Sequence, residues 1–343
     1  MNIVVLCGGN STEREVSINS GYNVCHALRE KGHNAVLADA FFGLENTDIF
    51  NLSKNDYNIE KERDYIYSLS SKVAQTEKTR KSFFGENIIE ACKKADIVFL
   101  ALHGKNGEDG KCQAAFDLFG IKYTGSGHLA SAMGMDKAVT KQIFMSKGVP
   151  TAKSVWIKKG ENTNLFDYNM KFPVVVKACN GGSSVGVVLV NDEKEYKEAL
   201  NVCFELDNQI LIEDFIEGRE FSIGVINNKA LPIVEIIPKA GWYDYENKYK
   251  AGATDHICPA ILEEKTAEKM MKVAEDACKA IGCEVYARAD VMLDKDGKMY
   301  CLEVNTLPGM TPTSLIPDEA GAIGIDYPAL CENIIDLSLK KYK

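Results

Sequence analysis

The sequence contains no apolar run of about 18 residues, which is the length that a membrane-spanning helix needs. No signal-peptide pattern precedes the first apolar run, at residues 3–6. Internal repeats and low-complexity tracts are missing as well. These absences argue against a membrane-embedded, secreted or fibrous protein, and we expect one that works in the cytoplasm.

The sequence has fewer basic than acidic residues: 40 Lys and Arg against 49 Asp and Glu, which gives a formal net charge of −9. This balance disfavours nucleic acid or an anionic membrane as the main partner and leaves room for a local basic pocket. The chain has 343 residues, of which 45% are hydrophobic. That size and composition predict a folded protein of two or three domains.

Cysteines in metal-binding or disulfide spacing are also missing. The 11 cysteines are an odd number, form no C-x-x-C pair and lie in no His/Cys cluster at zinc spacing. Several of them sit inside apolar runs. We interpret them as reduced thiols, which excludes a small disulfide-stapled fold.

Short apolar runs alternate with helical patterns along the chain. In the first third the runs lie at residues 3–6, 35–38 and 97–102. This alternation favours a parallel α/β sheet. The polar stretch at about residues 43–95 is interpreted as a surface insertion, partly helical and without chemistry.

The remaining two thirds predict further elements. A helix is expected at residues 137–147, followed by strands and one long helix. The strands are expected at residues 155–157, 174–177, 185–190, 209–213, 220–226 and 233–236, and the long helix at residues 267–281. After the long helix, two further strands are expected to flank the turn at residues 294–298. The pattern therefore predicts hairpins in this part of the chain.

A glycine-rich turn at residues 180–186 joins two apolar strands, with Lys177 at the end of the first. Glycines let backbone N–H groups approach an anion, so this turn suits phosphate binding. The alternative is a flexible hairpin tip. It is not a Walker loop, because no Gly-Lys-Ser/Thr follows and a strand replaces the helix.

Two carboxylates are expected to face each other on the last hairpin. If the turn is at residues 295–298, Asp290 lies opposite Glu303 and Arg288 lies opposite Asn305. Like charges destabilise a sheet unless something positive separates them, and two carboxylates with an amide oxygen suit Mg²⁺ or Mn²⁺. The alternative is a solvated hairpin face with an ordinary Arg–carboxylate pair.

Three single residues are further candidates. Gly309 could present its N–H to an oxyanion, with Arg288 as a second donor, or could simply form a turn. His103 follows the third apolar run, where open α/β sheets place ligand contacts, although a lone histidine is more often structural. Glu13 is either a helix N-terminal carboxylate, the commoner case, or a ligand for an ammonium group.

These motifs resemble those of D-alanine–D-alanine ligases, which have the ATP-grasp fold. The matching segments run in family order over nearly the whole chain: GGNSTEREVS at 8–17, HGKNGEDG at 103–110, MDK at 135–137, GSSVG at 182–186, YDYENKY at 243–249, RAD at 288–290 and EVNTLPGMT at 303–311. The chain departs from the family pattern in the long insertion and at Ala178-Cys179-Asn180, where relatives often carry proline and a charged residue.

The resemblance implies an α/β fold with an N-terminal parallel α/β domain at residues 1–125, including the insertion at about 43–95. Two α+β lobes that enclose ATP would follow, a central one at residues 126–212 and a C-terminal one at 213–343. It implies ATP binding by Lys137, Lys177, Ser183, Ser184, Glu213, Asp214, Phe215, Ile216, Glu220 and Lys248. Two Mg²⁺ or Mn²⁺ ions would be held by Asp290, Glu303 and Asn305.

The resemblance also implies the remaining roles in joining two D-alanines through an acyl phosphate. The catalytic set would be Glu13, Ser183, Tyr249, Arg288 and Gly309, and the further substrate-binding residues would be His103, Ser314 and Leu315. Glu13 would hold the first ammonium group, and Ser183 and Tyr249 would pin a lid at residues 244–252 over the site. The product would serve peptidoglycan synthesis and hence the cell wall and cell shape.

Two alternatives accompany this interpretation. One is a related ligase that uses D-serine or D-lactate as its second substrate. Tyr249 argues for D-alanine, because the D-lactate enzymes resemble this family but lose that tyrosine. The other is a nucleotide-binding module without activity, which would be expected to have lost at least one of Arg288, Asp290, Glu303 and Asn305. The expected partners are ATP and D-alanine, with no nucleic acid and no membrane, and a homodimer is left open.

Overall fold

The computed structural model describes residues 1–51, 57–182, 185–239 and 253–343. The chain begins with a parallel three-stranded sheet in the order β2-β1-β3. Its strands are β1 (Asn2–Cys7), β2 (Asn34–Asp39) and β3 (Ile97–Leu100). The apolar side chains of all three are buried, as the unbroken apolar runs predict. The expected parallel sheet is confirmed.

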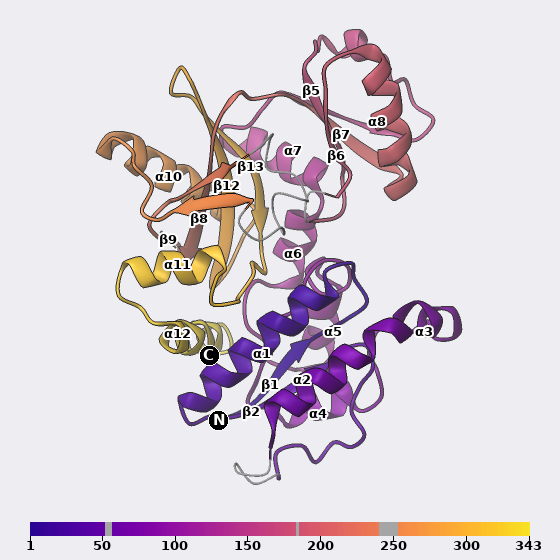
Figure 1. The fold of residues 1–343 in the computed structure, drawn as a ribbon, viewed down its shortest axis with the longest axis vertical. Helices are drawn as coiled ribbons and strands as arrows, with labels where there is room; N and C mark the ends of the chain where they lie inside the picture. The colour runs from indigo at the N-terminus through magenta and orange to yellow at the C-terminus, as the bar shows by residue number, and fades with distance from the viewer. Residues whose placement is uncertain (52–56, 183–184, 240–252) are drawn as a thin grey trace.

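Helices complete this first domain, which lies at the bottom of Figure 1. They are α1 (Arg14–Glu30), α2 (Ile59–Ser68), the 3₁₀ turn η1 (Ser70–Lys72), α3 (Val73–Thr79), α4 (Ile88–Lys94) and α5 (Lys111–Phe119). The stretch at residues 43–95 is partly helical, as expected. It is more than a surface insertion, because Ile59 and Ile66 are buried in the core of the domain.

Two helices, α6 (His128–Met135) and α7 (Lys137–Lys147), connect the first domain to a small lobe. The bounds of α7 agree with the expected ones for local reasons. The Asp136 side chain accepts hydrogen bonds from the N–H groups of Ala138 and Val139, which caps the start of α7. Gly148 ends it with φ +73°, a left-handed conformation that glycine adopts without strain.

The small lobe, pink in Figure 1, is an antiparallel sheet in the order β4-β7-β5-β6. Its elements are β4 (Ser154–Lys158), η2 (Leu165–Tyr168), β5 (Val174–Ala178), β6 (Val187–Val190), α8 (Glu193–Leu206) and β7 (Gln209–Asp214). Strands β5 and β6 pair as the predicted hairpin around the glycine-rich turn. One face of the sheet packs against α8.

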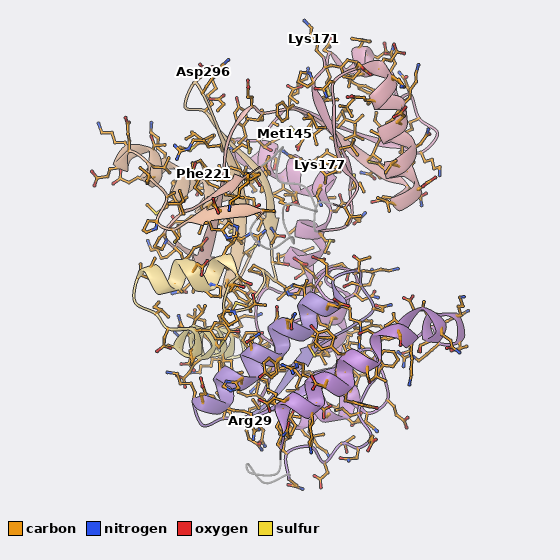
Figure 2. All side chains as sticks on the ribbon, viewed as in Figure 1. Arg29, Met145, Lys171, Lys177, Phe221 and Asp296 are labelled. Atoms are coloured by element: carbon orange, nitrogen blue, oxygen red, sulfur yellow. The ribbon has the colours of Figure 1, made fainter. Side chains whose placement is uncertain are left out.

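The third sheet, orange to yellow in Figure 1, runs in the order β11-β10-β8-β12-β13, with β9 on β8. Its elements are β8 (Gly218–Ile226), β9 (Lys229–Ala230), β10 (Val234–Pro238), β11 (Thr254–Ile257), α10 (Glu264–Ala280), β12 (Tyr286–Asp294) and β13 (Met299–Asn305). Helix α10 covers one face through an apolar stripe. The turn of the β12–β13 hairpin, marked by Asp296 in Figure 2, points away from the first domain.

The last two helices, α11 (Leu315–Ala322) and α12 (Tyr327–Lys340), lead the chain back to its beginning. Helix α12 packs against α1, and Leu330 and Ile334 share one core with the strands of the first sheet. The end of the chain therefore helps to build the first domain.

Two expectations about the whole chain can be compared with the structure. Within the residues it describes, none of the helices combines the length and the apolar character that crossing a membrane requires. All 11 cysteines are free, and most of them are buried, in agreement with their interpretation as reduced thiols.

Candidate active site

A cavity of about 400 Å³ lies between the sheet of the small lobe and the β8–β12–β13 sheet. Nine of the residues expected to bind nucleotide or metal line it: Lys137, Lys177, Glu213, Asp214, Phe215, Ile216, Glu220, Asp290 and Glu303. They come from α7, from β5 and β7, from the segment between β7 and β8, and from the third sheet. The structure therefore brings residues that are up to 166 positions apart in sequence to one cavity.

Glu213, a residue of the cavity wall, forms ion pairs with two lysines. One carboxylate oxygen is paired with Lys177 Nζ, and the other lies 2.7 Å from Lys141 Nζ. Burial alone would raise the pKa of Glu213, but the two lysines lower it to about 2. Burial likewise opposes the charge of Lys177, and Glu213 outweighs it, so the pKa of Lys177 is raised. Both groups are therefore charged at neutral pH.

The glycine-rich turn is tied to the rest of the cavity by Lys137. Its Nζ donates to the Gly181 carbonyl at 2.7 Å and lies 3.7 Å from Glu303 Oε2. At the base of the turn, the Asn180 N–H donates to Asp207 Oδ2 at 2.8 Å. A single cation at the start of α7 thus joins the predicted phosphate turn to the predicted metal site.

The last hairpin has the predicted pairing at the site, with Asp290 opposite Glu303 and Arg288 opposite Asn305. A β-bulge after Asp290 shifts the register by one residue toward the turn. Arg288 grips Asp290 with two hydrogen bonds, Nε to Oδ1 at 2.9 Å and Nη2 to Oδ2 at 2.8 Å. The positive charge of Arg288 offsets that of Asp290 and so reduces the repulsion between the two opposed carboxylates.

Asp290, Glu303 and Asn305 fit a hard divalent cation. Asp290 is buried, Glu303 is partly exposed, and both carboxylates line the cavity. Asn305 Nδ2 donates to Asp290 Oδ2 at 3.2 Å, which places the amide beside the carboxylates. In the part of the chain that the structure describes, no three His, Cys, Asp or Glu side chains cluster as a metal site. The predicted set has only two carboxylates, and its oxygen donors are those that Mg²⁺ and Mn²⁺ prefer.

Glu13 lies where the first domain meets the glycine-rich turn. A methyl group added to Gly182 would lie 3.0 Å from Glu13 Oε2, and one added to Gly104 would lie 2.9 Å from the same oxygen. The backbones of two glycines therefore lie close to this carboxylate, and a side chain at either position would push the Glu13 carboxylate aside. The predicted partner Ser183 follows Gly182 directly, but it lies outside the described residues.

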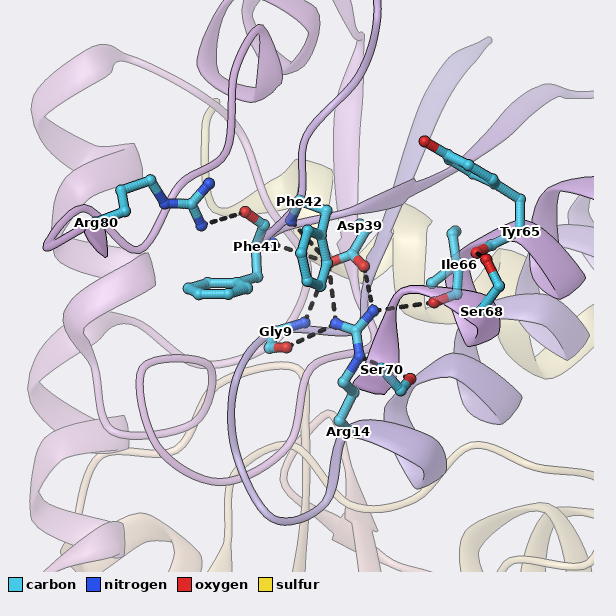
Figure 3. Close-up of polar contacts among 10 residues, drawn as sticks. All are labelled: Gly9, Arg14, Asp39, Phe41, Phe42, Tyr65, Ile66, Ser68, Ser70 and Arg80. Carbon is cyan, nitrogen blue, oxygen red and sulfur yellow. Dashed lines mark hydrogen bonds and ion pairs between the residues drawn. The ribbon is translucent and has the colours of Figure 1, made fainter. Parts of the chain in front are cut away.

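The loop that carries Glu13 is held by Arg14 (Figure 3). The Arg14 guanidinium pairs with Asp39 at 2.5 Å and donates to the carbonyls of Gly9 at 2.6 Å and Ile66 at 3.1 Å. Its Nε donates to Ser70 Oγ at 3.1 Å. Ile66 and Ser70 belong to the stretch at residues 43–95. That stretch, interpreted from sequence as remote from chemistry, thus supports the loop beside a predicted catalytic residue.

His103 is buried and bonded through both ring nitrogens. Nδ1 lies 3.1 Å from the Leu307 carbonyl, to which it must donate, and Nε2 lies 3.2 Å from Ser20 Oγ. The ring thereby joins the first domain to the loop that carries Gly309. A contact of His103 with substrate stays a prediction.

Gly309, Ser314 and Leu315 come together at the start of α11. Ser314 Oγ accepts from the Thr311 N–H at 3.0 Å, and a methyl group on Gly309 would lie 3.0 Å from the same oxygen. Ser314 is the N-terminal cap position of α11 and Leu315 is its first residue. The N–H groups at a helix start favour an anion, so the position suits a carboxylate.

Glu108 is a site residue that the sequence reasoning did not single out. Its Oε2 accepts from the Gly104 N–H at 3.1 Å. Burial raises its pKa to about 7, Glu13 adds to the effect, and the Gly104 N–H opposes it. The signal was present in sequence, since Glu108 lies inside the segment that begins at His103, but only the fold places it beside Glu13.

We expect Glu108→Gln to change how stability depends on pH. The folded state binds the Glu108 proton more tightly than the unfolded chain, whose carboxyl has a pKa near 4.5. Glu108 thus contributes stability that is full below pH 4.5 and is lost as the pH rises through about 7. Between pH 5 and pH 8, the free energy of unfolding measured with urea should fall by roughly 1 to 3 kcal/mol more in the wild type than in the variant.

The control for this measurement is Glu198→Gln on the exposed face of α8. Its unfolding free energy should follow the wild-type curve at both pH values. Parallel curves for wild type and Glu108→Gln would contradict a raised pKa at Glu108.

Four predicted site residues lie outside the described residues, namely Ser183, Ser184, Lys248 and Tyr249. The expected lid at residues 244–252 lies outside them as well. Their roles stay predictions.

Comparison with known proteins supplies the family. The family model described as D-ala D-ala ligase N-terminus matches residues 2–126, and the one described as D-ala D-ala ligase C-terminus matches residues 143–336. The D-alanine–D-alanine ligase of Pediococcus pentosaceus is 43% identical, over 98% of this chain and 97% of its own. That of Lacticaseibacillus casei is 42% identical, over 100% and 97%.

Solved structures agree with the sequence comparisons. The structure of D-alanine–D-alanine ligase from Bacillus anthracis complexed with ATP has a TM-score of 0.77 at 33% identity, covering 99% of this chain and 98% of that one. The ligase from Coxiella burnetii has a TM-score of 0.76 at 26% identity, covering 100% and 94%.

Proposed function

The chain belongs to the D-alanine–D-alanine ligase family, with the ATP-grasp fold and the ATP-dependent ligase activity of that family, and on this premise we propose how its residues perform the reaction. Two D-alanines are joined to D-alanyl-D-alanine, a precursor of peptidoglycan. The observation that carries the proposal is the position of the Arg288–Asp290 and Glu303 hairpin. Asp290 and Glu303 of this hairpin line the cavity, and the loop that carries Gly309 follows directly after β13.

ATP binds in the cavity between the small lobe and the third sheet. Residues 213–216 at the end of β7 line one edge of this cavity and take the adenine, and Glu220 on β8 takes the ribose. Lys137 and Lys177 are cations on the wall and neutralise the phosphates. The glycine-rich turn adds backbone N–H groups.

Asp290, Glu303 and Asn305 would hold two Mg²⁺ or Mn²⁺ ions, which would supply positive charge to offset that of the phosphate oxygens. The chain itself keeps the ligand set in place. Arg288 and Ser222 both donate to Asp290, so this carboxylate cannot rotate freely.

Substrate binds where the first domain, the hairpin and α11 converge. Glu13 holds the ammonium group of the first D-alanine, and the start of α11 at Ser314 and Leu315 holds the carboxylate of the second. The first carboxylate attacks the γ-phosphorus, and ADP leaves. The second amine then attacks the acyl phosphate carbonyl, loses its proton, and expels inorganic phosphate. Arg288 and the Gly309 N–H stabilise the oxyanion of the tetrahedral intermediate.

The proposal is tested by incubating the enzyme with ATP and Mg²⁺ and with D-alanine as the only amino acid, or with D-serine or D-lactate added. The products are identified by mass spectrometry. D-alanyl-D-alanine should dominate, with one phosphate released per dipeptide. A mixed D-alanyl-D-serine or D-alanyl-D-lactate product in excess would assign the second substrate differently. Absence of any product with D-alanine would contradict the assignment.

D-cycloserine, a rigid analogue of D-alanine, should compete with D-alanine. Its ring fixes the amine and the carboxylate-like group in one arrangement, so it loses little conformational entropy on binding. We expect the apparent KM for D-alanine to rise with D-cycloserine while the KM for ATP is unchanged, measured by ADP formation. Rates insensitive to saturating D-cycloserine would count against the substrate assignment.

A further inference from the structure

Lys141 is a buried cation that the reaction does not touch. It lies on α7, one turn beyond Lys137, and only 1% of its surface is exposed. The cavity lining includes Lys137 and Lys177 and leaves Lys141 behind the wall. Burying an unpaired ammonium group costs free energy, so a partner for Lys141 is expected close by.

Lys141 is paired with Glu213, which it shares with Lys177. Glu213 Oε2 lies 2.7 Å from Lys141 Nζ, and Glu213 Oε1 is paired with Lys177 Nζ. Each oxygen of this buried carboxylate is therefore ion-paired with a different lysine, and the contact of Oε2 with Lys141 is a charge contact without hydrogen-bond geometry. The side chain of Glu213 cannot turn without breaking one of these pairs.

The far side of Lys141 is anchored to the third sheet. Its Nζ donates to Thr151 Oγ1 at 2.6 Å, and Thr151 Oγ1 donates to the Cys301 carbonyl at 2.7 Å. Cys301 lies on β13, two residues before Glu303, and its N–H donates to the Pro150 carbonyl at 2.7 Å. One chain of contacts thus runs from the metal-site strand through Lys141 to Glu213 and Lys177.

Sharing the carboxylate changes what Lys177 offers to a ligand. A carboxylate paired with one lysine alone would hold that ammonium group as a neutral pair. With Lys141 on its other oxygen, Glu213 neutralises only part of the charge of Lys177, whose side chain lines the cavity. The three groups together carry one net positive charge.

We propose that Lys141 is a positioning residue for nucleotide binding, which acts through Glu213 to hold Lys177 at the cavity wall with its charge available to ATP. This inference rests on the proposed function, because ATP is the anion that the cavity takes. It assigns a role to a residue outside the cavity lining. Without Lys141, Glu213 would pair with Lys177 alone and would neutralise more of the Lys177 charge.

The test is Lys141→Met, a substitution of similar length without charge. Calorimetric titration should show ADP binding about tenfold weaker than in the wild type, and the KM for ATP should rise by a similar factor. The KM for D-alanine should change less than twofold. Lys197→Met, which breaks an exposed pair with Glu193 on α8, is the matched control and should leave all three values unchanged.

A second comparison shows whether Lys141 acts through Glu213. In the background of Glu213→Gln, adding Lys141→Met should change ADP affinity less than twofold, because the shared carboxylate is already gone. A tenfold loss in both backgrounds would overturn the proposal. So would ADP binding by a folded Lys141→Met variant that equals the wild type.

Folding is monitored by circular dichroism and thermal unfolding. Lys141→Gln keeps a hydrogen-bond donor at the position and serves the same measurements if the Met variant does not fold. Loss of folding in both variants would assign Lys141 to stability alone and overturn the proposal. Failure of the wild type to form D-alanyl-D-alanine, with ADP binding intact, would instead contradict the proposed function.

Discussion

Glu303→Gln is expected to abolish ligase turnover while the protein stays folded. The substitution keeps the size of the side chain and removes one of the two carboxylates on the cavity side of the hairpin. Without that charge, we expect the rate of phosphoryl transfer to fall at least roughly 10³-fold, which corresponds to about 4 kcal/mol of lost transition-state stabilisation. Phosphate release with ATP, Mg²⁺ and D-alanine measures the effect.

Stability should change little in this variant. Glu303 is partly exposed, and its ion pair with Lys137 spans 3.7 Å, so this pair contributes less than about 1 kcal/mol. Asp296→Asn, in the exposed turn of the same hairpin, is the matched control and should keep wild-type activity (Figure 2). Wild-type rates in a folded Glu303→Gln protein would rule out the metal-binding assignment.

Arg288→Lys should have the second largest effect. Lysine keeps the positive charge beside Asp290, so the buried carboxylate retains a partner and the fold is preserved. It lacks the planar fork that lets arginine bond Asp290 twice and still donate to another group. We expect kcat to fall about 10²- to 10³-fold, as for loss of one oxyanion donor.

The KM for ATP should stay within about threefold of the wild-type value in Arg288→Lys, because Arg288 is assigned to the oxyanion and not to the nucleotide. Arg63→Lys, in an exposed pair with Asp64, is the control for an arginine change of the same kind. An unchanged kcat, or a defect confined to ATP binding, would move Arg288 out of its catalytic role.

Local patterns in the sequence were sufficient for the hairpin and for α7. Side chains alternate along a strand, so the position of the turn determines which residues face each other. A correct turn position therefore pairs Arg288 with Asn305 and Asp290 with Glu303. The same reasoning could not foresee the bulge after Asp290, because a bulge depends on packing against the neighbouring strand. It changed the register only toward the turn and left the site pairs intact.

Contacts between distant segments were beyond sequence patterns. The approach of Gly182 and Gly104 to Glu13 joins loops that are 78 positions apart, and α12 returns to the first domain. No periodicity encodes which loops meet. The interpretation of residues 43–95 as a surface insertion was wrong for the same reason. The hydrogen bond from Arg14 to the Ile66 carbonyl forms only after this stretch has folded onto α1.

The sequence by itself determined the fold class, the family resemblance and the chemical types at the site, because strand alternation, helix caps and glycine turns act over a few neighbouring residues. The tertiary structure alone decided the electrostatic environment. Glu108 and Glu213 are both glutamates, yet burial beside Glu13 raises the pKa of one to about 7, and two lysines lower that of the other to about 2. Charge interactions depend on distance and solvent exposure, and only the folded chain sets these.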